Sequence, residues 1–284
     1  IVHATNFPYQ LRSHFEGQNL MQGGGLSPFS ETTGWLGRAL DLAKTPGRSL
    51  SLDMPLLLRG SEKNDNFYPA SIKGSGDLMT QLIDTISMAH KDNESETFKK
   101  VSKKSTQREV NIPRDPASLA KFAGKAMAQD GGPLASVIKV DQFDTHARQG
   151  AEEDGRQGAR LVIIDDIMAG LKEGLGDAWD QSIVLTLTEF GRTVAVKGSE
   201  GTEHGFGSAG LLAGGAISKS RVISDWPGLA KNEQFEQRDL MSTIDYRSVC
   251  AACIEKALGL DHDLIASEVF FTPKLTRVYD LIFS

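Results

Sequence analysis

Apolar residues recur along this chain with two periods, which predict strands in some stretches and helices in others. Short apolar runs at 1–4, 134–140 and 183–187 are typical of buried strands, and 49–58 is expected to form a strand pair or one strand with an irregular edge. Apolar spacing and terminal signals predict helices at 13–22, 34–42, 77–90, 117–128, 157–175 and 245–258. Because strands and helices alternate, we expect an α/β fold.

Local signals mark where several of these helices begin and end. Ser13 and Glu16 have the spacing of a capping box, in which each side chain accepts from the backbone N–H of the other residue. Gly23–Gly25 are expected to end that helix, since glycine tolerates the left-handed conformation found there. Thr243 is expected to cap the helix at 245–258.

The regular alternation is interrupted between residues 60 and 115. Residues 60–76 are polar, and 91–108 is strongly charged, which is typical of a solvated segment rather than a binding site. We therefore expect one domain over 1–284 with a polar helical excursion at about 60–115. The stretch 157–175 carries an apolar face expected to pack on a sheet, formed by Leu161, Ile164, Met168 and Leu171.

Composition narrows the class of protein. The chain has 284 residues, 39% of them hydrophobic and 24% charged, which fits one large globular domain better than two. A net charge of −6 gives no general attraction to nucleic acid or to anionic membranes. No run approaches the roughly 18 apolar residues of a membrane span. Since the chain begins with Ile1 inside an apolar run, we expect sequence to be missing upstream, including any targeting signal.

Two motifs imitate functional signatures. Cys250 and Cys253 form a C-x-x-C, but they fall in the middle of a predicted helix, so core packing is favoured over redox chemistry. Residues 205–210 match G-x-G-x-x-G, yet an apolar run follows where a dinucleotide site requires a helix. The chain contains no P-loop, H-E-x-x-H or G-x-S-x-G motif.

The richest chemistry follows the apolar run at 183–187. Glu189 comes directly after this run, and His204 lies in the glycine-rich loop that leads to the next apolar run at 211–213. Ligands of α/β proteins bind at the carboxyl ends of strands, so an acid and a histidine here suit a metal or oxyanion site. The alternative is a capped strand end with a solvated histidine.

A second group follows the predicted strand at 134–140. Asp144 and His146 form an Asp-x-His on the loop after this strand, where a carboxylate and an imidazole can converge on one cation. Asp and His are also ordinary loop residues, so this pair alone is a weak signal. Acids and histidines after two strands joined by a helix strengthen the case for a shared metal site.

Three further residues are candidates with open alternatives. Ser13 begins a predicted helix, where the N-terminus can stabilise an oxyanion beside a nucleophile, although the residues favour a helix cap over a nucleophile. His14 beside it is either a metal ligand or a loop histidine. Arg192 could make a bidentate contact to an oxyanion or a salt bridge within its loop.

Several motifs occur in an order that resembles a known family. They are IVHAT, RSHFEGQ, GWLGRAL, FDTHARQ, LTEFGRT, GTEHG, LLAGGAI, DWPGL and TIDYR, and they extend along nearly the whole chain. The chain is similar to the bacterial family known as domain of unknown function 1501, a divergent branch of the alkaline phosphatase and sulfatase superfamily. The resemblance implies a three-layer α/β/α sandwich with a mixed, mostly parallel sheet, and a twin-arginine signal for export to the periplasm or the medium.

The resemblance also implies roles for particular residues. Ser13 takes the place of the superfamily's nucleophile, Asp144 with His146 the place of one metal-binding pair, and His204 that of a final histidine ligand. Glu189 stands at a strand end that usually carries Asp-His, but Phe190 follows it, so one imidazole is absent. The superfamily's first acidic ligand belongs to a strand that this sequence does not contain. The site therefore holds one metal, recruits His14, or is inactive.

Two functions from different classes follow. The first is a hydrolase of phosphate or sulfate esters, on small molecules or polymers, that uses a divalent cation such as zinc, manganese, calcium or iron. The second is a non-catalytic binding or assembly protein of the cell envelope that keeps the phosphatase-like fold. Neither nucleic acid nor a membrane span is expected, and the sequence leaves the oligomeric state open.

Overall fold

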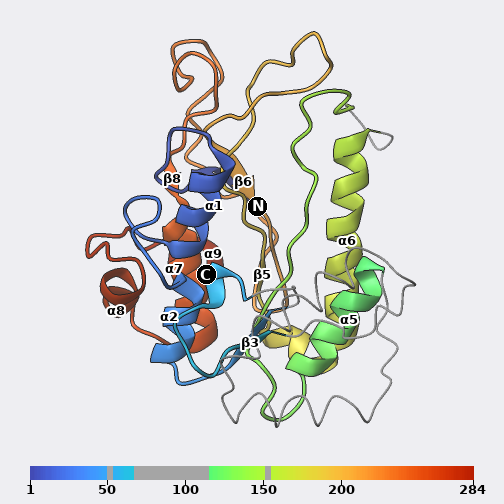
Figure 1. The fold of residues 1–284 in the computed structure, drawn as a ribbon, viewed down its shortest axis with the longest axis vertical. Coiled ribbons are helices and arrows are strands. Elements are labelled where there is room, and N and C mark those ends of the chain that lie inside the picture. Colours follow the sequence, from blue (N-terminus) through green and yellow to red (C-terminus); the bar gives the residue numbers. More distant parts are fainter. Residues whose placement is uncertain (50–53, 67–114, 151–154) are drawn as a thin grey trace, which may run out of the picture. The chain divides into compact units, whose positions relative to one another are not determined.

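The computed structural model describes residues 1–49, 54–66, 115–150 and 155–284 (Figure 1). The segments Ile1–Phe67 and Asp115–Ser284 form one compact unit. The helix predicted at 77–90 and the charged stretch at 91–108 lie outside the described residues, so the polar excursion stays a prediction. Within the described part of the chain, no helix has the length and apolar character needed to cross a membrane.

The described strands form three small sheets. In the first, β1 lies between antiparallel β6 and parallel β8. In the second, β2 pairs in parallel with β3 and with β4, and in the third β5 and β7 are antiparallel. The bounds are β1 Val2–Asn6, β2 Gly47–Ser49, β3 Asp65–Asn66, β4 Ala135–Val137, β5 Val184–Leu185, β6 Ser208–Gly210, β7 Leu212–Ala213 and β8 Ile244–Asp245.

The α/β class is confirmed, but these strands do not join into the one mostly parallel sheet expected of a three-layer sandwich. β4 and β5 are shorter than the apolar runs that predicted them, whereas β1 extends two residues past its predicted end. Leu56–Leu58, expected in a strand pair, forms a 3₁₀ helix instead. The physical reason is local, since Pro55 starts the turn and its carbonyl accepts from the Leu58 N–H at 3.1 Å.

Helices account for most of the regular structure described. Their bounds are α1 His14–Gly23, α2 Trp35–Leu42, α5 Pro116–Met127, α6 Arg156–Leu175, α7 Tyr246–Leu258, α8 His262–Leu264 and α9 Tyr279–Phe283. Short 3₁₀ segments η1 (Leu56–Leu58) and η2 (Gly176–Gln181) and the π-helical turn η3 (Ile265–Val269) complete the list.

The predicted capping box and the predicted Thr243 cap are both wrong. Ser13 stands at the N-cap of α1, but its side chain makes no capping hydrogen bond. The expected capping box fails because the Glu16 carboxylate instead accepts a hydrogen bond from the Tyr9 hydroxyl. Asp245, rather than Thr243, caps α7, and its carboxylate accepts from the Arg247 N–H at 2.9 Å.

The end of α1 is as predicted. Gly24 has φ of 70°, and its N–H donates to the carbonyl of Leu20 at 2.7 Å. This left-handed C-cap explains why glycine stands at this position.

Helix α6 packs mainly against α5, and Val184 of β5 is packed against the same cluster. Its buried positions include Ile167, Leu171 and Leu175, whereas Leu161 is 48% exposed. The buried face of α6 therefore differs from the predicted one and includes glycines, and the buried face of α5 consists of alanine and glycine. Gly170 and Gly174 allow the close approach, because a Cβ on either would lie within 2.2 Å of an α5 carbonyl oxygen.

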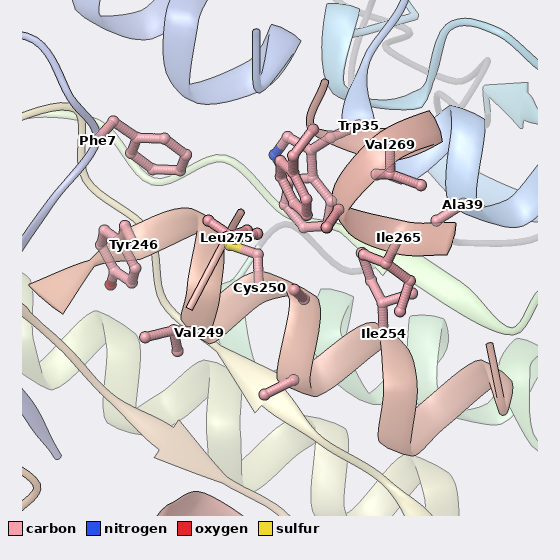
Figure 2. Close-up of a cluster of buried hydrophobic side chains, with 14 of the residues drawn as sticks. Phe7, Trp35, Ala39, Tyr246, Val249, Cys250, Ile254, Ile265, Val269 and Leu275 are labelled. Carbon is pink, nitrogen blue, oxygen red and sulfur yellow. The ribbon is translucent and has the colours of Figure 1, made fainter. Parts of the chain in front are cut away.

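The main core surrounds α7 (Figure 2). Tyr246 and Cys250 of α7 pack with Phe7, which follows β1, and with Trp35 and Phe270 from other parts of the chain. Both cysteines lie inside α7, Cys250 buried and Cys253 partly buried, as the sequence predicted for core residues. Burial raises the pKa of the Cys253 thiol to about 12.

Candidate metal centre

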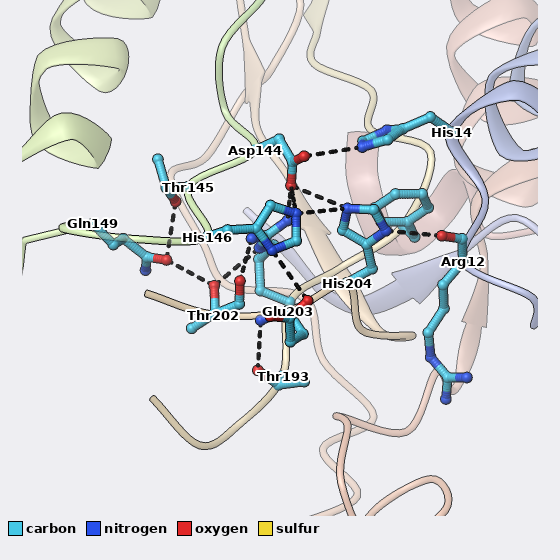
Figure 3. Close-up of polar contacts among 12 residues, drawn as sticks. Arg12, His14, Asp144, Thr145, His146, Gln149, Thr193, Thr202, Glu203 and His204 are labelled. Carbon is cyan, nitrogen blue, oxygen red and sulfur yellow. Dashed lines mark hydrogen bonds and ion pairs between the residues drawn. The ribbon is translucent and has the colours of Figure 1, made fainter. Parts of the chain in front are cut away.

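Three separate segments meet around the carboxylate of Asp144 (Figure 3). Asp144 and His146 lie on the loop that follows β4, and His14 is the first residue of α1. His204 lies between β5 and β6, and Arg192 pairs with it in an isolated antiparallel bridge. This bridge places the segment with Glu189 and Arg192 beside the loop that carries His204.

The Nε2 atoms of three imidazoles face the two oxygens of Asp144. His146 Nε2 lies 2.8 Å and His204 Nε2 3.0 Å from Asp144 Oδ1. His14 Nε2 lies 3.2 Å from Oδ2. The ligand atoms of His14, Asp144 and His204 all lie within 4.8 Å of one another, and His146 Nε2 lies 3.2 Å from His204 Nε2.

The Nδ1 atom of each of these imidazoles faces an oxygen that can only accept. His14 Nδ1 lies 2.8 Å from Glu189 Oε1, and His146 Nδ1 lies 3.1 Å from Glu203 Oε2. His204 Nδ1 lies 2.9 Å from the carbonyl oxygen of Arg12. Because carboxylate and carbonyl oxygens offer no hydrogen, the hydrogen bonds of His14 and His204 favour a proton on Nδ1.

This arrangement fits a bound cation. A neutral imidazole with Nδ1–H has a lone pair on Nε2, and where two such nitrogens face one another, as in His146 and His204, the lone pairs repel. A divalent cation relieves that repulsion, and ligands at 2.0–2.1 Å in a tetrahedron are about 3.3 Å apart, close to the separations found here. Histidine ligands of metals are commonly held at the other nitrogen by a carboxylate or a carbonyl.

Electrostatics in the metal-free site follow from the same contacts. Burial opposes the charge on Asp144, but Arg192 and the surrounding histidines outweigh it and hold the pKa of this carboxyl well below its usual range. Burial also lowers the pKa of His14, and its hydrogen bonds to Glu189 and Asp144 outweigh this effect and raise the pKa above the ordinary value. Asp144 is therefore an anion at neutral pH and available as a ligand.

Arg192 lies on the flank of the centre and is well paired. Its Nη1 donates to Asp144 Oδ1 at 2.5 Å, its Nε donates to Thr202 Oγ1 at 2.9 Å, and its Nη2 donates to the Thr202 carbonyl. Thr202 in turn donates to Gln149 Oε1 at 2.7 Å. These contacts favour the loop salt bridge among the roles predicted for Arg192, since its donors already have protein partners.

Glu189 lies behind His14 and is less exposed than the other acids of the site. Its Oε1 accepts from Gln18 Nε2 at 3.1 Å as well as contacting His14. Gly17 lets the strand end approach α1, because a Cβ there would lie 3.2 Å from the Glu189 Cβ. Glu189 is placed to orient an imidazole, a different role from the direct metal ligand that the sequence indicated.

Phe190 forms an apolar wall beside the imidazoles. Its buried ring lies 4.5 Å from the His204 ring and 4.9 Å from the His14 ring, measured between centroids. The position at which the resemblance implies a missing imidazole therefore holds a packed phenyl ring. His14, from a segment far away in the sequence, brings an imidazole to the same centre.

Ser13 is adjacent to His14, but its described contacts lead elsewhere. Its backbone N–H donates to the Tyr9 hydroxyl at 3.3 Å, and among the described residues its side chain makes no hydrogen bond to the histidines or to Asp144. Sequence reasoning overlooked two groups, Glu203 and the carbonyl of Arg12. Glu203 directly precedes His204, so its acidic side chain was a usable signal, whereas no side-chain pattern could reveal the Arg12 carbonyl.

The sequence comparison places the chain in a family. The family model described as "Protein of unknown function (DUF1501)" matches residues 2–251, and the chain belongs to this family. Comparisons with curated proteins and with solved structures found no match.

Proposed function

We propose that this chain is a metal-dependent hydrolase of phosphate or sulfate esters with an alkaline phosphatase-like three-layer fold. One observation carries the proposal: three Nε2 atoms converge on Asp144 while each Nδ1 is held by an oxygen. The ester class, the finer fold and a periplasmic or secreted location, reached through a twin-arginine signal, come from the family resemblance described above.

The donor set narrows the choice of cation. Imidazole nitrogens with one carboxylate oxygen suit zinc, iron or manganese, whereas calcium prefers a shell of oxygens. His14, Asp144 and His204 would hold the cation, with His146 Nε2 next to two of them, 2.8 Å from Asp144 Oδ1 and 3.2 Å from His204 Nε2. A cation bound there would lower the pKa of a bound water and polarise an ester oxygen.

The residues around the cation would keep its ligands charged and correctly oriented. Asp144 keeps its negative charge through Arg192, and Glu189 and Glu203 hold His14 and His146 with Nε2 turned inward. Water is the nucleophile that we favour over Ser13, because the described contacts of Ser13 lead to Tyr9. Arg192 would act through Asp144 and not through the substrate.

A non-catalytic binding or assembly protein of the envelope is the second candidate. The observation that favours it is the ring of Phe190, which packs against His14 and His204. The family resemblance implies a metal-binding histidine at this position in the superfamily. Such a protein would bind a cation for stability and would leave phosphate and sulfate esters intact.

Elemental analysis of the purified chain, without chelator, tests the first proposal. We expect a near-stoichiometric transition metal that is lost in His204→Ala and retained in Glu200→Gln, a matched change at an exposed acid of the same loop. The loaded protein should then hydrolyse p-nitrophenyl phosphate or p-nitrophenyl sulfate, with turnover abolished in His204→Ala.

The possible outcomes separate the two candidates. Metal binding without turnover of either ester would contradict the hydrolase and support the non-catalytic protein. Absence of metal even after incubation with zinc, iron or manganese would overturn both the centre and the hydrolase.

A further inference from the structure

A fully buried carboxylate lies behind the centre, outside the set of candidate ligands. Asp239 has no exposed surface, and its two oxygens accept hydrogen bonds from two arginines. Arg12 Nε donates to Oδ2 at 2.7 Å, and Arg238 Nε donates to Oδ1 at 2.8 Å. An anion buried this completely is retained only where such partners compensate the loss of water.

The first arginine leads to the imidazole of His204. Arg12 has φ of 55°, a left-handed conformation that is uncommon for a residue with a side chain. In this conformation its carbonyl oxygen faces His204 Nδ1 at 2.9 Å, while its guanidinium extends away from the centre (Figure 3). The ion pair with Asp239 fixes the side chain of the residue whose carbonyl orients His204.

The second arginine leads to the backbone of the same histidine. Arg238 Nη2 donates to the His204 carbonyl oxygen at 2.5 Å, in addition to the contact of its Nε with Asp239. One carboxylate is thus connected to both ends of His204, to the imidazole through Arg12 and to the main chain through Arg238.

The backbone around Asp239 is hydrogen-bonded to the loop that carries His204. Asp239 forms isolated antiparallel bridges with Thr193 and with Phe235. The neighbouring Leu240 carbonyl accepts from the Gly207 N–H at 2.8 Å, three residues beyond His204. The segment that carries Asp239 therefore contacts the loop on both sides of the candidate ligand.

We propose that Asp239 is a positioning residue, which holds His204 through Arg12 and Arg238 so that Nδ1 stays bonded and Nε2 points into the centre. The inference rests on the proposed function for the role of His204 as a metal ligand. Residues that orient metal-binding histidines typically change metal affinity by about 10- to 100-fold when they are replaced.

The test compares Asp239→Asn with Glu236→Gln in the full chain. Glu236 accepts from the same Arg12 at 2.6 Å but is exposed, so this control removes an Arg12 partner without touching the buried carboxylate. The first readout is the Nδ1–H proton of His204 in metal-free, ¹⁵N-histidine-labelled protein, assigned by its loss in His204→Asn. We expect slow exchange with water in the wild type and in Glu236→Gln, and fast exchange in Asp239→Asn.

The second readout is zinc affinity by competition with a chromophoric chelator. We expect about a tenfold loss in Asp239→Asn and no change in Glu236→Gln. Because Asp239→Asn could also destabilise the fold, Arg238→Met provides a second variant, in which Asp239 keeps Arg12 and the half-exposed Arg238 side chain is removed. We expect this variant to fold and to lose zinc affinity by a smaller factor.

These readouts distinguish the two proposals. If the wild type binds none of zinc, iron and manganese, the proposed function fails, while the exchange of the His204 Nδ1–H still decides the role of Asp239. Unchanged proton exchange and zinc affinity in folded Asp239→Asn and Arg238→Met would overturn the positioning role alone.

Discussion

At the scale of single residues, Glu203 and Asp144 differ in what they do at the centre. Glu203 lies 3.1 Å from His146 Nδ1 and is also paired with Lys197, so it faces the outer nitrogen of an imidazole. Asp144 faces the inner nitrogens of three. The same chemical group thus orients a ligand at one position and is itself a ligand at the other.

Replacing each acid by its amide separates these roles. We expect Glu203→Gln to keep the metal stoichiometry and to weaken zinc binding about 10- to 100-fold, because only the orientation of His146 is lost. We expect Asp144→Asn to lose the metal altogether, since it removes the anion among the ligands. Zinc titration with elemental analysis measures both, and Glu200→Gln serves as the neutral control; equal effects of the two amides would contradict the division of roles.

At the scale of elements, the pair α5 and α6 depends on glycine at the contact. A Cβ at position 174 would lie 2.2 Å from the Lys121 carbonyl oxygen, which is main chain and cannot turn aside. Alanine is the better helix former by about 1 kcal/mol, so on an exposed helix Gly174→Ala would stabilise. Here the helices must separate, and overpacking of this kind costs about 1–3 kcal/mol.

We therefore expect Gly174→Ala to lower the free energy of unfolding, measured by urea denaturation, by about 1–3 kcal/mol. Gly198→Ala is the matched control, because a Cβ at that position meets no atom within 4 Å. Its expected effect is within about 0.5 kcal/mol. A stabilising Gly174→Ala would show that helix propensity outweighs the close approach of α5 and α6.

The elements also show which parts of the structure the sequence could predict. α1, α2, α5, α6 and α7 begin and end close to the predicted residues, because helix signals are local and repeat within a few positions. The way in which the strands pair into separate sheets was not predictable from such local signals. β1 pairs with β6 and β8, which lie near the other end of the chain, and no local pattern encodes such partners.

In the candidate centre, too, the sequence predicted the residue types but not the contacts between distant residues. The sequence singled out Asp144, His146 and His204 as residue types suited to a cation, and the structure brings them together with His14. It could not assign Glu189 to the outer nitrogen of His14, since that role depends on a contact across 175 positions.

At the scale of the whole molecule, the centre joins parts of the chain that are distant in sequence. His14 contacts Asp144 across 130 positions, and His204 contacts Asp144 across 60. A cation held by these residues binds the folded chain and not the unfolded one, so its binding free energy adds to the free energy of unfolding. Without a cation, hydrogen bonds such as that between His14 and Asp144 join these segments.

Metal removal should therefore destabilise the entire described unit rather than one loop. With zinc at 100 times its dissociation constant, the gain in unfolding free energy is about 2.7 kcal/mol. For a chain of this length, that corresponds to a rise in melting temperature of about 5 °C, which EDTA should abolish. Asp144→Asn should melt at one temperature with or without EDTA, as measured by calorimetry. If the wild type behaves in the same way, no cation joins these segments, and the acids and histidines are held by hydrogen bonds alone.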